Sequence, residues 1–306
     1  VVIRDIGANN EDPLITLSRL LNVDPRAKII MASTLSFANV RKSMIGFERG
    51  AADFIQTPAL HTRRKDNITF RADLLRLISA LAVARRNEAT RPVVGKLLGK
   101  PNAVPENFTL RAASLYRPGV LAIGSSTGGP EALYRVINEL PDNFPLPILV
   151  TQHMPKLFTA VLAKTLSKRT GKSAVEAAQG MRVEPGKIYI APGDHHMTIF
   201  GTAQHSIIAV DQNPPVNYCR PSVDPMLESI VNIHKEKTLV VILTGMGEDG
   251  KTGAELAVNA GGSVVAQDSA TSVVWGMPGA VAEAGLCCQV LPLDQIAAEI
   301  CHIVKV

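Results

Sequence analysis

The alternation of short apolar runs with longer amphipathic segments predicts an α/β protein built on a mainly parallel sheet. From residue 119 onward, six runs rich in Val, Ile and Leu have the composition of buried strands: GVLAIG, PILVTQH, KIYIAP, LVVILTG, GSVVAQ and CCQVLP. Segments with helical spacing separate several of them: GPEALYRVINEL, LFTAVLAKTLSKRT, VDPMLESIVNIH, GKTGAELAVNAG and LDQIAAEICHIV. Strands that are apolar throughout are covered on both faces, so the pattern predicts a doubly wound sheet. Within it, MTIFGTAQHSIIAV has turn residues between two short strands and predicts an inserted hairpin.

A shorter α/β pattern precedes this one. Residues 1–58 predict three strands, VVIRDI, KIIMAS and DFIQ, separated by the helical segments PLITLSRLLNV and FANVRKSMIGFERGA. Because VVIRDI has the character of a buried strand at the first residue, we expect this unit to be truncated before Val1. Residues 59–118 contain one basic amphipathic helix, around Asp73 to Arg86, and then scattered Pro, Gly and Asn. The pattern therefore predicts a partial α/β unit over 1–58, a basic linker with one helix over 59–118, and a larger α/β domain over 119–306.

The composition narrows the classes of protein to which this chain can belong. Its 306 residues are 46% hydrophobic and 19% charged, and no apolar run approaches the ~20 residues of a membrane-spanning helix. No secretory signal opens the sequence. The four cysteines, Cys219, Cys287, Cys288 and Cys301, lack the spacing of a zinc site or a disulfide framework. We expect a cytoplasmic protein with reduced thiols, no metal and no membrane insertion.

The net charge of +5 is spread unevenly along the chain. Lys and Arg minus Asp and Glu come to +1 over residues 1–60, +8 over 61–118 and −4 over 119–306. A fold that holds nucleic acid carries positive charge on the folded domain itself, so we expect no nucleic acid as a partner. The basic segment is explained by a solvated helix face, or by docking onto an acidic partner or onto the acidic larger domain.

The loop GSSTGG, after the first strand of the larger domain, could bind a phosphate or hold a nucleophile. Gly124, Gly128 and Gly129 form G-x-x-x-G-G, which is not the dinucleotide motif, and no G-K-[ST] follows as in a P-loop. A nicotinamide site also needs an acidic residue at the end of the next strand, where Gln152 and His153 stand instead. The sequence therefore disfavours a phosphate loop.

A serine nucleophile fits the same loop better. GSSTG matches G-x-S-x-G with Ser126 at its centre, in a tight strand-to-helix turn that exposes the hydroxyl. A serine needs a base, and the base needs an orienting acid. His153 and Asp249 follow two other predicted strands, so all three residues lie at carboxyl ends of parallel strands, where ligands gather. The Gly-rich loop TGMGEDG also offers the backbone N–H of Met246 to a developing oxyanion.

Each of these residues alone has a plainer explanation. A serine in a glycine turn is usually a helix N-cap, and a loop aspartate usually forms a turn. A histidine at a strand end usually lies on the polar surface. The coincidence of all three at strand ends is harder to explain in this way. Their order along the chain, Ser, His, Asp, differs from that of α/β-hydrolases, so that fold is not the expected host.

Four motifs carry a resemblance to a known family. These are AIGSSTGGPEAL, LVTQHMP, NYCRPSVDPML and VILTGMGEDGKTGA, in this order. Residues 119–306 resemble the catalytic domain of the chemotaxis response regulator protein-glutamate methylesterases, the receptor methylesterase and deamidase family. The resemblance implies hydrolysis of glutamate methyl esters on the cytoplasmic domains of methyl-accepting chemoreceptors, in chemotaxis adaptation. In many members it also implies deamidation of receptor glutamines.

The same resemblance implies roles for particular residues. Ser126 is expected to be the nucleophile, His153 the base and Asp249 the orienting acid of a Ser-His-Asp triad. Thr127 and Met246 are expected to assist on the oxyanion side. This chemistry needs no metal and no organic cofactor.

A fourth polar residue stands out in the motif NYCRPSVDPM. Arg220 could pair with acidic groups near the substrate glutamate, because Arg binds carboxylates bidentately. The alternative is a structural arginine that bridges the loop to the sheet.

Members of the family carry an N-terminal receiver domain, and residues 1–58 resemble the second half of one. The resemblance places Asp5 as the phosphoacceptor, Ser33 at the switch hydroxyl and a histidine kinase as the phosphodonor. However, Thr57 stands where a lysine is expected, and the acidic pair that binds Mg²⁺ would lie before Val1. A threonine cannot pair with phosphoryl oxygens as a cation, so we expect poor phosphoryl transfer to Asp5.

Two further functions stay open on sequence grounds. The degraded receiver pattern favours the same serine-esterase fold acting on a different acyl substrate, outside the usual phosphorelay. A non-enzymatic nucleotide-binding or scaffold module is the other, although such a module has no reason to retain Ser126, His153 and Asp249 together.

Overall fold

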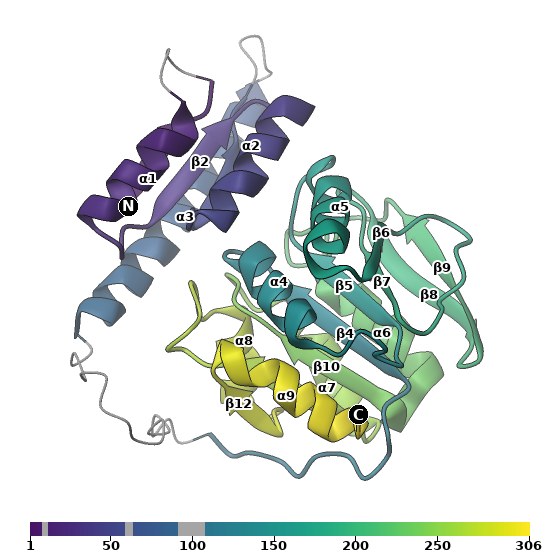
Figure 1. Ribbon diagram of the computed structural model, residues 1–306. Helices are drawn as coiled ribbons and strands as arrows, with labels where there is room; N and C mark the ends of the chain where they lie inside the picture. Colours follow the sequence, from purple (N-terminus) through teal and green to yellow (C-terminus); the bar gives the residue numbers. More distant parts are fainter. Residues whose placement is uncertain (8–11, 59–63, 91–107) are drawn as a thin grey trace.

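The chain folds into two α/β units that lie side by side (Figure 1). The structure is a computed structural model that describes residues 1–7, 12–58, 64–90 and 108–306. Most of the predicted linker after the basic helix, 91–107, lies outside the described residues.

A three-stranded parallel sheet forms the first unit, in the strand order β1–β2–β3. Its elements are those that the sequence predicts: β1 (Val2–Asp5), α1 (Pro13–Val23), β2 (Ile29–Ser33), α2 (Phe37–Glu48) and β3 (Asp53–Gln56). The central strand β2 is buried at every position, which explains why its sequence is apolar without alternation. The side chain of Ser36 begins α2 by accepting a hydrogen bond from the Asn39 N–H at 3.2 Å.

The basic helix of the sequence is present as α3 (Arg64–Thr90), and it is longer than predicted. Leu77 and Leu81, one helical turn apart, are buried in a cluster with Ile30 and Ile55 of the sheet. An apolar stripe of this kind buries its leucines and leaves the basic positions outside. The helix is therefore a packed element of the first unit.

The second unit is a seven-stranded parallel sheet with an antiparallel hairpin beside it. The strand order is β12–β11–β10–β4–β5–β7–β6. The strands are β4 (Val120–Ser125), β5 (Ile148–Gln152), β6 (Ser173–Glu176), β7 (Lys187–Ile190), β10 (Thr238–Ile242), β11 (Ser263–Gln267) and β12 (Gln289–Leu291), and the hairpin is β8 (His196–Thr202) with β9 (His205–Asp211). The helices are α4 (Gly129–Glu139), α5 (Phe158–Thr170), α6 (Val223–His234), α7 (Lys251–Asn259), α8 (Met277–Glu283) and α9 (Leu293–Val304), with the short 3₁₀ turn η1 (Lys235–Lys237) after α6.

The six predicted strands and the predicted hairpin of this unit are confirmed. The sequence did not predict β6 or α8. Strand β6 lies at the edge of the sheet and buries only Ala174 of its four residues, so it has no apolar run to reveal it. Helix α8 has only seven residues, which is too short to show a clear helical period.

Helices cover both faces of the large sheet (Figure 1). The residues of β4 point alternately to the two sides: Leu121 and Ile123 pack in one core with α4, α5 and α9. Val120 and Ala122 pack in another core with α6, α7 and α8. This confirms the predicted doubly wound arrangement.

No helix in the described part of the chain combines the length and the apolar character that a membrane span requires.

The central position of β4 determines which loops meet. It lies between β5 and β10, with Ser125 opposite Gln152 and Gly124 opposite Ile242. Because all three strands are parallel, the segments that follow them emerge at the same edge of the sheet. That edge carries the loops in which the sequence predicts Ser126, His153 and Asp249.

Truncation of a central core leucine is expected to destabilise the second unit. Leu121 is fully buried, whereas Leu115 is 96% exposed. We expect Leu121→Ala to lower the free energy of unfolding by about 2–5 kcal/mol through lost burial and a residual cavity. Leu115→Ala is the matched control and should change it by less than about 0.5 kcal/mol. Urea unfolding followed by circular dichroism measures both, and equal effects of the two variants would contradict the assigned core.

Candidate active site

Two glycines shape the turn in which Ser126 lies, between β4 and α4. Gly128 has a φ of +79° and precedes the first residue of α4. A Cβ on Gly128 would collide with Val273, and one on Gly129 would collide with the side chain of Gln152. Only glycine tolerates this conformation and this close packing together, and the packing holds the turn at the sheet edge.

The hydroxyl of Ser126 is the free one in this loop. Its neighbours Ser125 and Thr127 are buried, whereas Ser126 is partly exposed. Ser125 Oγ donates to Gln152 Oε1 at 2.6 Å, and Gln152 Nε2 donates to the carbonyl of Ser126 at 2.9 Å. Among the described residues, no hydrogen bond reaches Ser126 Oγ. The backbone of the serine is thus held firmly and its hydroxyl is left available.

His153 follows β5 directly and is paired with Asp249. Its Nε2 lies 2.7 Å from Asp249 Oδ2, and the two side chains are 12% and 3% exposed. The backbone N–H of His153 donates to the carbonyl of Ser125 at 3.0 Å, so the histidine begins next to the Ser126 turn. The backbone N–H of Ser126 donates to the carbonyl of Thr244, at the start of the loop that carries Asp249, at 3.0 Å. The structure therefore brings the three residues to one edge of the sheet.

The carboxylate of Asp249 is held by a dense set of donors. Asn217 Nδ2 and Ser222 Oγ donate to its Oδ1 at 2.9 and 2.7 Å. The backbone N–H of Val223, at the start of α6, donates to its Oδ2 at 2.7 Å. Donors at a helix N-terminus stabilise a negative charge. These donors consequently fix the position of the carboxylate independently of His153.

These contacts shift the ionisation of both partners. Burial disfavours the charged form of Asp249, but the hydrogen bonds from His153, Ser222 and Val223 outweigh it and hold the pKa of this carboxyl well below its usual range. Burial likewise lowers the pKa of His153, but the hydrogen bonds to Asp249 and to Cys219 reverse this and raise it to about 10. An opposite charge within hydrogen-bond distance favours both charged forms. The paired carboxylate thus stabilises the positive charge that the ring acquires when it takes up a proton.

A second buried carboxylate supports the first. Asp224, on α6, accepts from Asn217 Nδ2 at 2.8 Å and from the backbone N–H of Gly253 at 2.8 Å. Burial raises the pKa of Asp224 to about 6, and the nearby charge of Asp249 acts in the same direction. The amide of Asn217 therefore bridges the two carboxyl groups and separates their charges.

Thr127 and Met246, predicted on the oxyanion side, lie against the first unit. Thr127 Oγ1 donates to Asp53 Oδ2 at 2.5 Å, and burial raises the pKa of Asp53 to about 6. The side chain of Met246 packs on the cluster that contains Leu77 and Leu81 of α3. Both residues that flank the Ser126 site are therefore in contact with the first unit.

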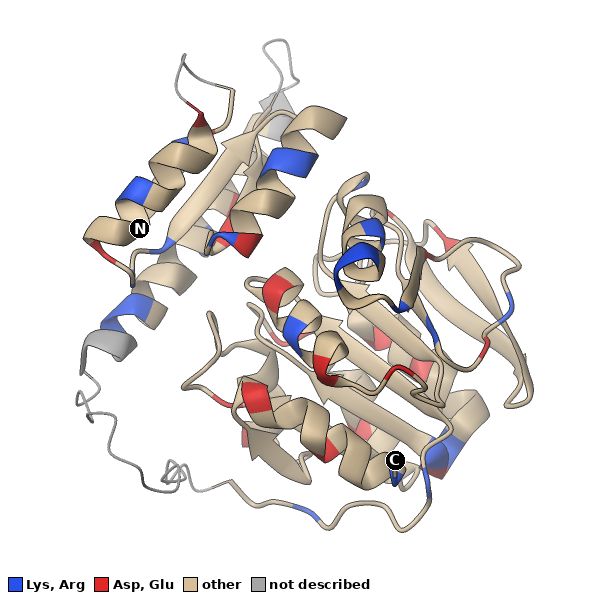
Figure 2. Cartoon of the chain, viewed as in Figure 1, with Lys and Arg blue, Asp and Glu red and all other residues tan. Residues whose placement is uncertain are grey.

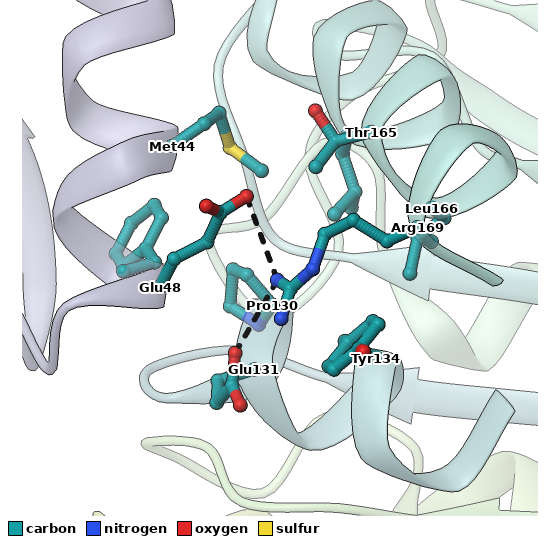
Figure 3. A pocket seen from close by; sticks show the side chains of 10 residues that line it. Met44, Glu48, Pro130, Glu131, Tyr134, Thr165, Leu166 and Arg169 are labelled. Carbon is teal, nitrogen blue, oxygen red and sulfur yellow. Dashed lines mark ion pairs between the residues drawn. The ribbon is translucent and has the colours of Figure 1, made fainter. Parts of the chain in front are cut away.

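Further contacts join the two units beside this site. Phe54 of β3 packs on Phe158 of α5, with ring centroids 4.3 Å apart. Figure 3 shows Arg169 of α5 between Glu48 of α2 and Glu131 of α4, with N–O distances of 3.6 and 3.5 Å. Figure 2 shows Lys and Arg on α5 and acidic residues on α4, so this ion-pair cluster combines both signs.

Arg220, predicted as a candidate for substrate contact, has its guanidinium bound to its own loop and to Asp194, in the turn before β8. Its Nη2 and Nε lie 2.6 and 3.1 Å from Asp194 Oδ1, and its Nη1 donates to the carbonyls of Gln212 and Asn213 at 3.1 Å. The arginine also holds the pKa of Asp194 below its usual range. These bonds match the structural alternative, in which the arginine joins the loop to its surroundings.

Asp5, the candidate phosphoacceptor, is exposed at the carboxyl end of β1, and its Oδ1 accepts from the Gly7 N–H at 2.7 Å. Ser33 is buried at the end of β2, and the backbone N–H of Thr57 donates to its carbonyl at 2.8 Å. Within the described ranges, no group of three acidic, His or Cys side chains could hold a metal ion.

Sequence reasoning missed four residues that contact the His153–Asp249 pair or its support: Asn217, Cys219, Ser222 and Asp224. All four lie in the motif NYCRPSVDPM, from which only Arg220 was selected. The density of polar residues between Asn217 and the start of α6 was the available signal.

The fold and the site together define a class: a doubly wound α/β protein with Ser, His and Asp side chains beyond the carboxyl ends of its central strands. The sequence profile described as CheB methylesterase matches residues 121–300. A protein-glutamate methylesterase/protein-glutamine glutaminase 1 of Paramagnetospirillum magneticum is 42% identical over 97% of this chain and 82% of its own length. A protein-glutamate methylesterase/protein-glutamine glutaminase of Azospirillum brasilense is 45% identical over 97% of this chain and 78% of its own.

A solved structure agrees with these relatives. The catalytic domain of the Thermotoga maritima CheB methylesterase is 43% identical, with a TM-score of 0.59, and covers 62% of this chain and all of that domain. The chain therefore belongs to the CheB methylesterase family and is a hydrolase. This confirms the family that the four sequence motifs indicate.

Loss of the Asp249 charge is expected to lower the pKa of His153 strongly. In Asp249→Asn, burial of the ring acts against the cation without the paired carboxylate, so the raised value of about 10 should fall by several units. NMR titration of the His153 ring measures this. The matched control is Glu248→Gln, which removes an adjacent carboxylate that is 69% exposed and should leave the titration unchanged. A titration of Asp249→Asn like that of the parent chain would refute the pairing.

Proposed function

We propose that this chain hydrolyses the methyl esters of glutamate side chains on chemoreceptor cytoplasmic domains, in the cytoplasm, during chemotaxis adaptation. The names of its relatives support this substrate, and they also support deamidation of glutamine side chains by the same site. The observation that carries the proposal is the available hydroxyl of Ser126 beside the buried His153–Asp249 pair.

The nitrogen that serves as the base follows from the hydrogen bonds. Nε2 of His153 is committed to Asp249 at 2.7 Å, so Nδ1 is the atom left to receive the proton of Ser126. As Ser126 Oγ attacks the ester carbonyl, this proton passes to Nδ1 and the ring becomes an imidazolium. The Asp249 carboxylate stabilises that cation and holds the ring in its orientation.

The imidazolium then protonates the leaving group. Methanol departs, and a glutamyl ester of Ser126 remains. A water molecule, deprotonated by the same Nδ1 of His153, hydrolyses this ester and restores the serine. With a glutamine side chain the same steps release ammonia in place of methanol, which accounts for the deamidase activity in the names of the relatives.

Two backbone N–H groups support a site for the oxyanion. Within the described residues, the N–H groups of Thr127 and Met246 donate to no backbone or side-chain acceptor. Thr127 lies next to Ser126 in the same loop. Met246 lies in the loop after β10, which is joined to Ser126 because the Ser126 N–H donates to the Thr244 carbonyl. Preorganised donors aimed at a developing oxyanion are worth about 3–4 kcal/mol each in comparable hydrolases.

The first unit is proposed to restrain this site. Asp53 contacts Thr127, and Met246 packs on the cluster that Leu77 and Leu81 of α3 form with the first sheet and Val274. We expect the unit to cover the side from which an ester would approach. We expect Asp5 to be its phosphoacceptor and a histidine kinase its phosphodonor. Thr57, in place of the expected lysine, supplies no cation for the phosphoryl oxygens, so we expect transfer to Asp5 to be weak.

Methanol release from methylated chemoreceptor should depend on the serine and the base. We expect Ser126→Ala and His153→Ala each to lower kcat by roughly 10⁴-fold or more, because removing either group disables the unit. The matched control is Ser173→Ala, which alters an exposed serine on the edge strand β6 and should leave the rate unchanged. If the parent chain is folded but releases no methanol, the proposed substrate is wrong, and other acyl esters would then be tested.

Loosening the contact between the units should raise the rate. Phe54→Asp places a charge against the Phe158 ring, and we expect several-fold faster methanol release because the first unit then covers the site less often. Phe37→Asp is the matched control, since Phe37 is 63% exposed on α2 of the same unit. Equal rates for the two variants would show that the contact does not restrain the enzyme.

A further inference from the structure

A thiol lies beside the catalytic histidine and has no role in the reaction described above. Cys219 Sγ is 3.5 Å from Nδ1 of His153, within hydrogen-bond distance for sulfur. Cys219 is partly exposed, whereas Cys287 and Cys288 are buried directly before β12, one in each of the two cores of the second unit. The thiol, the ring and Asp249 thus form a Cys–His–Asp chain of contacts in addition to the serine.

The turn that carries Cys219 is held rigidly on both sides. Val216 and Cys219 exchange two backbone hydrogen bonds, of 3.1 and 2.8 Å. Asn217, inside the turn, has a φ of +51° and donates to Asp249. On the other side, Arg220 is bound to Asp194 at 2.6 Å. The position of the sulfur next to the ring is therefore fixed by the same loop that orients the acid.

Two side chains, Ser126 and Cys219, compete for the one nitrogen of His153 that Asp249 does not occupy. Asp249 occupies Nε2 and Cys219 contacts Nδ1. In the proposed reaction Ser126 must pass its proton to the same Nδ1. In this structure Nδ1 contacts the thiol, and Ser126 Oγ receives no hydrogen bond from the described residues. We infer that Cys219 is a positioning residue that withholds Nδ1 of His153 from Ser126, and that the same contact makes Cys219 the thiol through which small electrophiles inactivate the esterase. This inference rests on the proposed function of Ser126 and His153.

Charged groups face the His153 ring from several neighbouring elements. Asp249 faces Nε2 from the loop after β10, and Asp224 of α6 acts through Asn217. Above the turn, Arg76 of α3 lies 5.3 Å from the centroid of the Tyr218 ring.

Three further titratable groups lie in the neighbouring loops. His196 contacts the loop through the N–H of Ser222, and Glu248 and Lys251 pair with each other next to Asp249. Of all these groups, Asp249 and Cys219 are the two that raise the pKa of His153 against the opposing effect of burial. Removing the thiol should therefore make the base available at lower pH.

The reaction with an electrophile follows from the contact. The thiol passes its proton to His153 Nδ1, as in enzymes that activate cysteine with histidine. With iodoacetamide, a sulfur–carbon bond forms, the carbon–iodine bond breaks and iodide leaves. The carbamidomethyl group that remains fills the space beside Nδ1 and blocks its approach to Ser126.

The first experiment compares the pH dependence of kcat/KM in the full chain. Cys219→Ala should shift the acidic limb to lower pH, by up to about one unit, and raise the rate on that limb by up to about tenfold. Cys219→Ser keeps a hydrogen-bonding group and should lie between the parent and the alanine variant. Cys301→Ala is the control and should match the parent. A slower Cys219→Ala enzyme with an unshifted profile would mean that the thiol is only structural, and would overturn the positioning role.

The second experiment reads the thiol without using activity. The full chain is treated with iodoacetamide at pH 6.5, and labelling of each cysteine is followed by mass spectrometry. Burial raises the pKa of Cys301, so Cys219 should label at least tenfold faster. His153→Gln should remove most of that difference, because the proton acceptor is lost. Equal labelling of Cys219 and Cys301, or labelling unchanged by His153→Gln, would overturn the contact.

The two readouts separate the inference from the proposed function. If the chain hydrolyses no methyl ester, the labelling experiment still tests the Cys219–His153 contact. If it is active, iodoacetamide should abolish methanol release in the parent and leave Cys219→Ser active. Loss of activity at the same rate in Cys219→Ser would place the sensitive thiol elsewhere.

Discussion

The parallel pairing of β4 with β5 on one side and β10 on the other is the constraint on which the site depends. Each strand contributes a loop to the same edge of the sheet, and the register sets how the loops meet. Backbone hydrogen bonds then join the loops directly, from His153 to Ser125 and from Ser126 to Thr244. Because these bonds continue the strand pairing, the positions of the serine and the histidine follow from the sheet itself, and flexible segments contribute little.

The acid is positioned by a different device. Asp249 lies in a glycine-rich loop, and it is held by Asn217, Ser222 and the first N–H groups of α6. These donors offset the cost of burying a carboxylate, which is otherwise several kcal/mol. The segment between β9 and α6 therefore supports the proposed triad although it carries none of its three members. The same segment places Cys219 on the second nitrogen of His153, so the support of the acid and the competition for the base have one structural origin.

The first unit meets the second at the residues that flank the serine. Asp53 accepts a hydrogen bond from Thr127, and Met246 packs on the cluster that contains Leu77 and Leu81 of α3. The ion pairs of Arg169 and the contact of Phe54 with Phe158 lie at the same junction (Figure 3). A part-buried hydrogen bond, an aromatic contact and a half-exposed ion-pair cluster respond differently to salt and pH, since salt screens the exposed pairs more strongly than the part-buried bond.

The sequence by itself determined the architecture of the second unit, because its strands are apolar runs and its helices have clear amphipathic spacing. It also indicated Ser126, His153 and Asp249, since each lies at or shortly after the end of a predicted strand and parallel strands end at a common edge. It could not reveal β6, whose edge position removes the apolar pattern, or the packing of α3 on the first sheet.

Only the tertiary structure decided which side chains surround the histidine. Asn217 and Cys219 lie 64 and 66 residues from His153 in the chain, and local pattern carries no information about contacts over such separations. Local pattern also could not predict the contacts of Arg220, because its place in the motif is compatible with substrate binding or with a structural role. Its partner Asp194 belongs to a turn before β8, and the folding of that turn against the loop settles where the guanidinium points. The apolar pattern of a strand is local, so the sequence predicts it. The hydrogen-bond partners of a polar side chain depend on how distant loops are brought together, so only the tertiary structure determines them.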